Sequence, residues 1–195
     1  MNYQHIILQN IPLHLAQREI NDLIGTIADF FMSDRLPGHL KKLKVWRNNV
    51  VNDRFFTWRN RSPADLLMIH RDVVRLVEVA FLLNMARINF QQVKLDAENF
   101  DTLIAAERND WECHAEYLSE KQLANPMRTI RKFCKAYTMH EYREHLAEWL
   151  TYGLSKHACI DYEPYDIIRV YENLQKLFEA CWLIRNRCLP PLLKS

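Results

Sequence analysis

The sequence predicts an all-α protein, a compact bundle of about five to seven helices. Apolar residues recur at helical spacing through most of the 195 residues, and the alternating pattern of β-strands is almost absent. The three glycines, Gly25, Gly38 and Gly153, stand far apart, so the chain has no Gly-rich phosphate loop, dinucleotide fingerprint or nucleophile elbow. Enzyme classes that depend on those loops are therefore excluded.

The first two predicted helices differ in how much of their surface is apolar. Residues 13–32 place their apolar side chains on one broad face and stop before the turn at residues 37–38. Ser62 followed by Pro63 is an N-cap with proline at the first helical position, which predicts a long helix over residues 62–90. The middle of that helix is apolar nearly all round, so other helices must cover it.

Further helices are predicted in the second half of the chain. Thr138 and Glu141 form a capping box, and the helix that they open stops at Gly153. The remaining predicted helices span residues 96 or 99 to about 118, 126–137 and about 161–189. We therefore expect a single helical domain over residues 1–195, with an N-terminal subdomain of residues 1–61 packed on a helical core of residues 62–195 as the alternative.

The segment around residues 40–61 is the exception to the helical pattern. Residues 42–46 and 54–58 are suited to pairing as a short β-hairpin, and equally to a short helix with an irregular loop. Periodicity leaves both alternatives open.

Overall composition points to a reducing compartment. Lys and Arg total 26 against 24 Asp and Glu, so the formal charge is only +2, and no apolar stretch approaches the roughly 20 residues of a membrane-spanning helix. The five cysteines include no C-x-x-C pair, which favours reduced thiols over disulfides or a zinc site: Cys113, Cys134, Cys159, Cys181 and Cys188. We expect a cytoplasmic protein that is not inserted in a membrane.

Positive charge is concentrated in residues 34–61. This segment holds eight basic residues and two acidic ones, a local charge of +6 (8 minus 2), together with several aromatic residues. Such a mixture is able to contact phosphates and stack on bases. The alternative is that the aromatic rings anchor the core while the cations face water or pair with acids. The candidate nucleic-acid-binding residues are Lys41, Lys42, Lys44, Trp46, Arg47, Arg54, Trp58, Arg59 and Arg61.

A second candidate site is the sequence Arg-Asn-x4-His formed by Arg108, Asn109 and His114. This spacing resembles the Arg-x(4–6)-His motif of the HEPN family, helical bundles that include metal-independent ribonucleases. The resemblance implies that Arg108 stabilises a phosphate and that His114, with an ordinary pKa of about 6.5, acts as general base or acid. The motif falls inside a predicted helix, and the alternative is a surface arginine and histidine without a catalytic role.

Taken together, these patterns favour a non-enzymatic cytoplasmic helical binding or regulatory module. A protein partner or a second copy of the chain is expected, with nucleic acid as a further partner through residues 35–61. No cofactor or metal is expected, because His140, Glu144 and Glu148, four residues apart, are typical of a solvated helix face. The alternatives are a HEPN-like ribonuclease and a small-ligand or metal-binding bundle.

Overall fold

The computed structural model describes residues 11–52, 62–86, 95, 99–111, 113–155 and 164–189. Within these residues there are nine helices and no strand, so the predicted all-α class is confirmed, although the helices outnumber the predicted five to seven. The helices are α2 (Gln17–Asn21), α3 (Leu23–Met32), α4 (Leu36–Val51), α5 (Pro63–Met85), α6 (Phe100–Asp110), α7 (Glu120–Ala124), α8 (Met127–Ala136), α9 (Met139–Leu154) and α10 (Pro164–Cys188).

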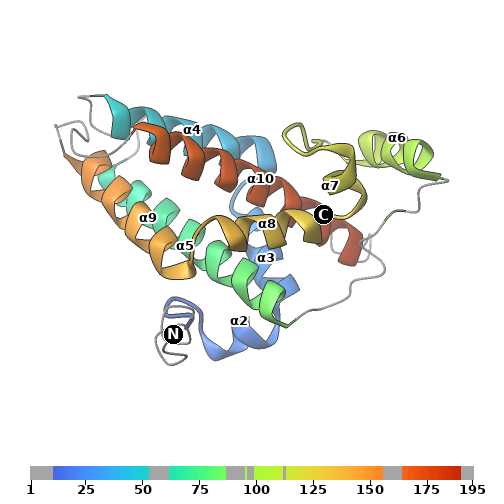
Figure 1. The fold of residues 1–195 in the computed structure, drawn as a ribbon, viewed down its shortest axis with the longest axis horizontal. Helices are drawn as coiled ribbons and strands as arrows, with labels where there is room; N and C mark the ends of the chain where they lie inside the picture. Colours follow the sequence, from blue (N-terminus) through green and yellow to red (C-terminus); the bar gives the residue numbers. More distant parts are fainter. Residues whose placement is uncertain are drawn as a thin grey trace.

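The long helices run side by side. Figure 1 shows α4 lying along α10 and α9 lying along α5, with α8 packed against both α5 and α10. α3 also contacts α5 and α10, while α6 and α7 lie toward the end of the bundle where α10 terminates (Figure 1). The helices α3 and α4, from the first 51 residues, thus pack directly on α5, α9 and α10, which follow residue 62.

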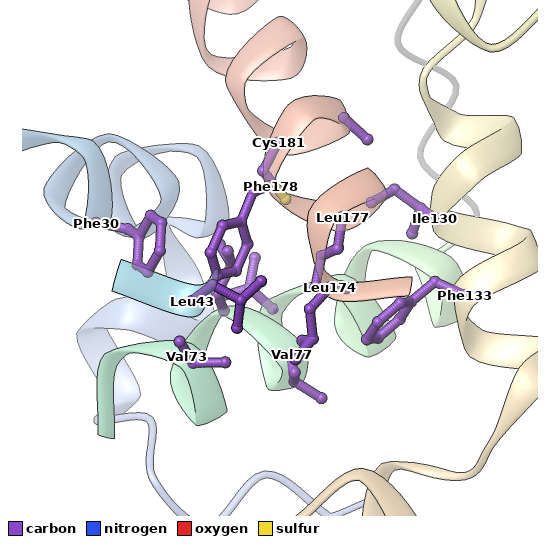
Figure 2. Close-up of a cluster of buried hydrophobic side chains, with 14 of the residues drawn as sticks. Phe30, Leu43, Val73, Val77, Ile130, Phe133, Leu174, Leu177, Phe178 and Cys181 are labelled. Carbon is purple, nitrogen blue, oxygen red and sulfur yellow. The ribbon is translucent and has the colours of Figure 1, made fainter. Parts of the chain in front are cut away.

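One face of α10 supplies the centre of the core. Its residues 174, 177, 178 and 181 are spaced so that they lie on one stripe, and all four are buried (Figure 2). They meet apolar side chains from four other helices. These are Phe30 of α3, Leu43 of α4, Val73 and Val77 of α5, and Ile130 and Phe133 of α8 (Figure 2). Burial of each large side chain stabilises the fold by roughly 1.5–3 kcal/mol, which explains why these helices associate.

The predicted first helix over residues 13–32 is in fact two helices. Asp22 has a non-helical backbone (φ −130°, ψ 77°) and separates α2 from α3. Its carboxylate accepts the backbone N–H of Gly25 at 2.8 Å, which caps the start of α3. The hydrophobic period continues across this break, so periodicity alone did not reveal it.

The β-hairpin considered for residues 40–61 is wrong for its first strand, because residues 36–51 form α4. The apolar residues Leu36, Leu43, Trp46 and Val50 follow helical spacing, and all are buried. Pro37 lies in the first turn, where a missing N–H costs nothing. The second predicted strand, residues 54–58, lies outside the described residues.

Both capping predictions are confirmed. The Ser62 hydroxyl accepts the N–H of Ala64 at 3.2 Å at the start of α5. The Thr138 hydroxyl accepts the N–H of Glu141 at 3.2 Å, and the Glu141 carboxylate accepts the N–H of Thr138 at 2.6 Å. These local side-chain bonds fix where two helices begin.

α9 ends at Leu154, one residue beyond the predicted end, and Ser155 rather than Gly153 is its C-cap residue. Gly153 lies inside α9, where a Cβ atom would come within 2.7 Å of Leu66 Cδ2 and 3.3 Å of the Trp46 ring. The glycine therefore lets α9 approach α4 and α5 closely, and its role is packing rather than capping.

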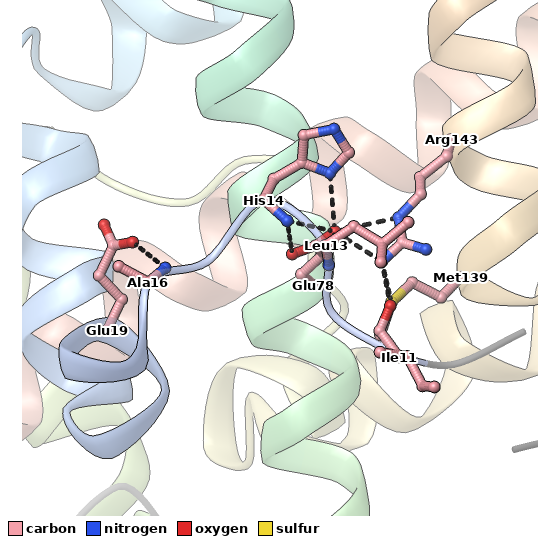
Figure 3. Close-up of polar contacts among 8 residues, drawn as sticks. All are labelled: Ile11, Leu13, His14, Ala16, Glu19, Glu78, Met139 and Arg143. Carbon is pink, nitrogen blue, oxygen red and sulfur yellow. Dashed lines mark hydrogen bonds and ion pairs between the residues drawn. The ribbon is translucent and has the colours of Figure 1, made fainter. Parts of the chain in front are cut away.

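A fully buried glutamate on α5 forms hydrogen bonds with the segment that precedes α2. Glu78 accepts backbone N–H groups from Leu13 at 3.0 Å and from His14 at 2.9 Å (Figure 3). Arg143 of α9 donates to the same carboxylate from Nε at 3.0 Å and from Nη2 at 2.6 Å. Burial alone would raise the pKa of Glu78, but the hydrogen bonds from His14 and Leu13 and the charge of Arg143 lower it.

Two further polar residues fix the α6–α7 region to α10. Glu179 is fully buried and accepts backbone N–H groups from Glu116 at 2.6 Å and Tyr117 at 2.8 Å, and burial raises its pKa to about 7. Arg187 forms a paired contact with Glu107 of α6 at 2.6 and 2.8 Å. These contacts position the loop that carries His114.

Candidate functional site

Some of the basic residues predicted to bind nucleic acid lie on the solvent-facing side of α4. This 16-residue helix contains Lys41, Lys42, Lys44 and Arg47 but no aspartate or glutamate. Lys41 and Lys44, one helical turn apart, are exposed. Lys42 instead points inward, is 8% exposed, and pairs with Asp34 at 2.7 Å. Two of the three predicted lysines therefore face solvent.

Trp46 is a core residue, which corrects its predicted role in stacking on bases. It is 0% exposed, its indole Nε1 donates to the backbone oxygen of Trp149 at 2.9 Å, and its ring meets the Trp149 ring edge-on at 5.6 Å between centroids. A nucleic-acid base has no access to this ring. The sequence contained a signal for this outcome, because Trp46 lies three residues after Leu43 and four before Val50 on the apolar stripe of α4.

Arg47 lies at the boundary between α4 and α10. Its guanidinium stands 4.5 Å from the centre of the Tyr171 ring, and its Nη2 donates to Asn48 Oδ1 at 2.6 Å. The cation is therefore held against α10 by a cation–π contact. The other predicted residues, Arg54, Trp58, Arg59 and Arg61, lie outside the described residues.

The Arg-Asn-x4-His sequence spans the end of α6 and the loop after it. Arg108 and Asn109 are exposed in the last turn, and α6 ends at Asp110. His114 lies in the loop, so the expectation that the whole motif is helical is wrong. Neither ring nitrogen of His114 has a hydrogen-bond partner among the described residues, and burial, followed by the charge of Arg108, lowers its pKa below 6.5. The imidazole is therefore neutral at neutral pH.

A surface hollow adjoins this motif. Arg108 and Asn109 line it together with Phe100, Ile104 and Glu120, and its volume is about 410 Å³. His114 is not among its lining residues. The structure thus brings Arg108 and Asn109 to one hollow and places His114 within electrostatic range of Arg108, but outside that hollow.

A cleft between α3, α4 and α5 was not predicted. It has a volume of about 170 Å³, and His39, Lys42, Asp65 and Asp72 line it beside Phe30 and other apolar residues. The His39 ring stacks on Phe30 at 4.0 Å, and burial together with the charge of Lys42 lowers its pKa to about 4. No sequence spacing links these residues, because they come from separate helices. The cleft is smaller than the roughly 300–1,000 Å³ of ordinary ligand pockets, so it does not by itself indicate a ligand.

The predicted solvated face of α9 is present. His140 and Glu144 are both exposed, and His140 Nε2 lies 3.2 Å from Glu144 Oε1. Among the residues that the structure describes, no three His, Cys, Asp or Glu side chains are grouped to hold a metal ion. None of the helices in that part of the chain combines the length and apolar character needed to cross a lipid bilayer.

Comparison with known proteins adds no further constraint. No protein-family model, curated protein or solved structure matches the chain.

Proposed function

We propose that the protein is a non-enzymatic, cytoplasmic helical binding or regulatory module that contacts nucleic acid through the exposed side of α4. The observation that supports this proposal is the arrangement of charge on α4, which has four cations, no acid, and two exposed lysines on one face. Phosphates are the natural partners of such a face. In the sequence, three further arginines follow α4 and add to the local positive charge: Arg54, Arg59 and Arg61.

Because Trp46 is buried, other residues must make the proposed contacts with nucleic acid. Because Trp46 and Lys42 belong to the interior, phosphate contacts fall to Lys41 and Lys44, and any stacking on bases falls to Trp58. Binding through phosphates depends strongly on salt and little on nucleotide sequence.

Substitution of Lys41 and Lys44 by glutamine is expected to weaken binding of single-stranded RNA and to flatten its salt dependence. Loss of two phosphate contacts lowers the slope of log K against log salt by about 1.4. The measurement is fluorescence anisotropy with labelled RNA at several salt concentrations. The matched control is Lys132→Gln with Lys135→Gln, which removes two exposed lysines with the same spacing from α8. Equal slopes for the two double variants would contradict the proposal.

A ribonuclease that uses Arg108 and His114 is the second candidate. It is favoured by the neutral imidazole of His114, which lies within electrostatic range of Arg108 and has no hydrogen-bond partner on either ring nitrogen. A neutral imidazole is able to remove a proton from a ribose 2′-hydroxyl, and a guanidinium is able to stabilise the phosphate that is attacked. Asn109 lies beside Arg108 on the same hollow.

If this second candidate is correct, purified protein will shorten RNA in a metal-free buffer, and His114→Ala will reduce the rate by about 10²-fold or more. Because the pKa of His114 is lowered, the rate should rise as pH increases from acid and reach half of its maximum below pH 6.5. Gel analysis of end-labelled RNA measures this rate. His140→Ala, which changes an exposed histidine on α9, is the control. Intact RNA after prolonged incubation with the wild-type protein would exclude the activity.

A further inference from the structure

The last turns of α10 bury a cation for which the described part of the chain supplies no counterion. Arg185 is 9% exposed, and among the described residues no carboxylate pairs with it. Its Nη1 donates to Asn186 Oδ1 at 3.1 Å, while its Nε has no partner. By contrast, Arg143 and Arg187 each contact a carboxylate within 3 Å. A buried charge without an opposite charge destabilises a folded protein, so Arg185 is an anomaly.

The polar groups next to Arg185 are also donors. The indole Nε1 of Trp182 and the amide Nδ2 of Asn186 are buried and have no hydrogen-bond partner in the part of the chain that the structure describes. Residues 182, 185 and 186 lie on one face of α10, because they are separated by three and four positions. The Arg185 guanidinium stands 5.3 Å from the centre of the Trp182 ring, and it occupies the side-chain oxygen of Asn186. The polar atoms on this face that lack a hydrogen-bond partner are therefore all donors: Trp182 Nε1, Arg185 Nε and Asn186 Nδ2.

The N-terminus of α4 faces the same region. The thiol of Cys113 contacts the backbone N–H of Leu36 and feels the charges of both Arg35 and Arg185, all of which oppose the rise in pKa that burial causes. The side chain of Arg35, the N-cap residue of α4, does not cap the helix. The Asp34 carboxylate lies at this end of α4, where it accepts the backbone N–H of Arg35 at 2.8 Å and pairs with Lys42. The charges of Arg35 and Arg185 therefore both act on the Cys113 thiol.

We infer that Arg185, Trp182 and Asn186 form a binding site for a small oxyanion, a phosphate or a carboxylate, beside the N-terminus of α4. The anion accepts hydrogen bonds from Arg185 Nε, Trp182 Nε1 and Asn186 Nδ2, and its charge balances the buried guanidinium. Arg185 retains some exposure, so the site is not sealed from solvent. This inference does not depend on nucleic-acid binding by α4.

The site is tested by calorimetric titration and thermal unfolding of the full chain with sodium phosphate, sodium sulfate and sodium acetate, each compared with sodium chloride at equal ionic strength. At a concentration of about 100 times Kd, linkage predicts a rise in unfolding temperature of roughly 5–10 °C. A response to phosphate and sulfate alone identifies a tetrahedral oxyanion, whereas a response to acetate identifies a carboxylate. Absence of binding by all three anions would overturn the inference.

The anion affinity of the Arg185→Met variant tests whether Arg185 belongs to the proposed site. Methionine removes the unpaired charge and keeps an unbranched side chain, so the free protein should unfold at the same or a higher temperature while anion affinity falls about ten-fold or more. Lys176→Gln removes a charge from the same helix and should leave affinity unchanged. Unchanged affinity in Arg185→Met, or equal losses in both variants, would overturn the assignment.

Asn186→Asp provides a second, independent variant. The new carboxylate takes the place of an amide that already contacts Arg185, so it supplies the counterion from within the chain. The free protein should become more stable and should lose its response to added anions. An Asn186→Asp protein that still binds phosphate with wild-type affinity would contradict the site.

Discussion

Replacement of Glu78 by alanine is expected to lower the free energy of unfolding by about 3–5 kcal/mol, because the change leaves the largely buried Arg143 cation without its carboxylate. The same change removes the acceptor of the Leu13 and His14 backbone N–H groups, which fasten the segment before α2 (Figure 3). Urea unfolding measures the loss. The control is Glu144→Ala, which removes an exposed glutamate of α9.

The same carboxylate predicts a pH dependence. Its pKa in the folded protein lies below the value of 4.5 for an unperturbed glutamate, so the unfolded chain binds a proton more readily than the folded one. The stabilisation is therefore present above pH 4.5 and is lost as the pH falls through the folded pKa. Glu78→Gln should show a weaker loss of stability in acid than the wild type. Equal stability of Glu78→Ala and Glu144→Ala at pH 7 would contradict this account of Glu78.

Replacement of Trp46 by alanine is expected to cost about 3–5 kcal/mol, since it empties a fully buried site between α4, α5 and α9. It also removes the bond from Trp46 Nε1 to the Trp149 oxygen. Thermal unfolding should show a lower midpoint and a less cooperative transition. The variant is therefore expected to be less stable whether or not nucleic acid is present.

Trp46→Phe separates the two roles that this residue could have. Phenylalanine keeps most of the apolar volume and loses the hydrogen bond, so a cost of roughly 1–2 kcal/mol is expected with the fold retained. Because the ring has no access to a base, affinity for RNA should equal that of the wild type. A loss of affinity without a loss of stability would show that Trp46 contacts nucleic acid after all.

Features that depend on neighbouring residues were predictable from the sequence. The N-cap at Ser62, the capping box at Thr138 and the apolar stripe of α10 each arise within a few turns of one helix. The break at Asp22 was missed because the apolar spacing continues through it. α4 was left open because Pro37 and Gly38 have the composition of a turn, whereas in the structure they occupy the first turn of a helix.

The candidate sites depended more on tertiary structure. The local charge of residues 34–61 was visible in the sequence, but the inward directions of Lys42 and Trp46 follow from the packing of α4 on α9 and α10. Arg185 fitted the ordinary pattern of basic residues at a helix C-terminus, and only its burial without a carboxylate distinguishes it from Arg187. Such contrasts arise between helices that are distant in sequence, so periodicity does not reveal them.

The measurement that tests the proposed function most directly is the anisotropy of labelled single- and double-stranded RNA and DNA with the wild-type protein at two salt concentrations. The proposal predicts saturable binding that weakens steeply with salt, with the strands intact on a gel afterwards. No binding at the lower salt concentration would contradict it, and the basic side of α4 would then have only a structural role.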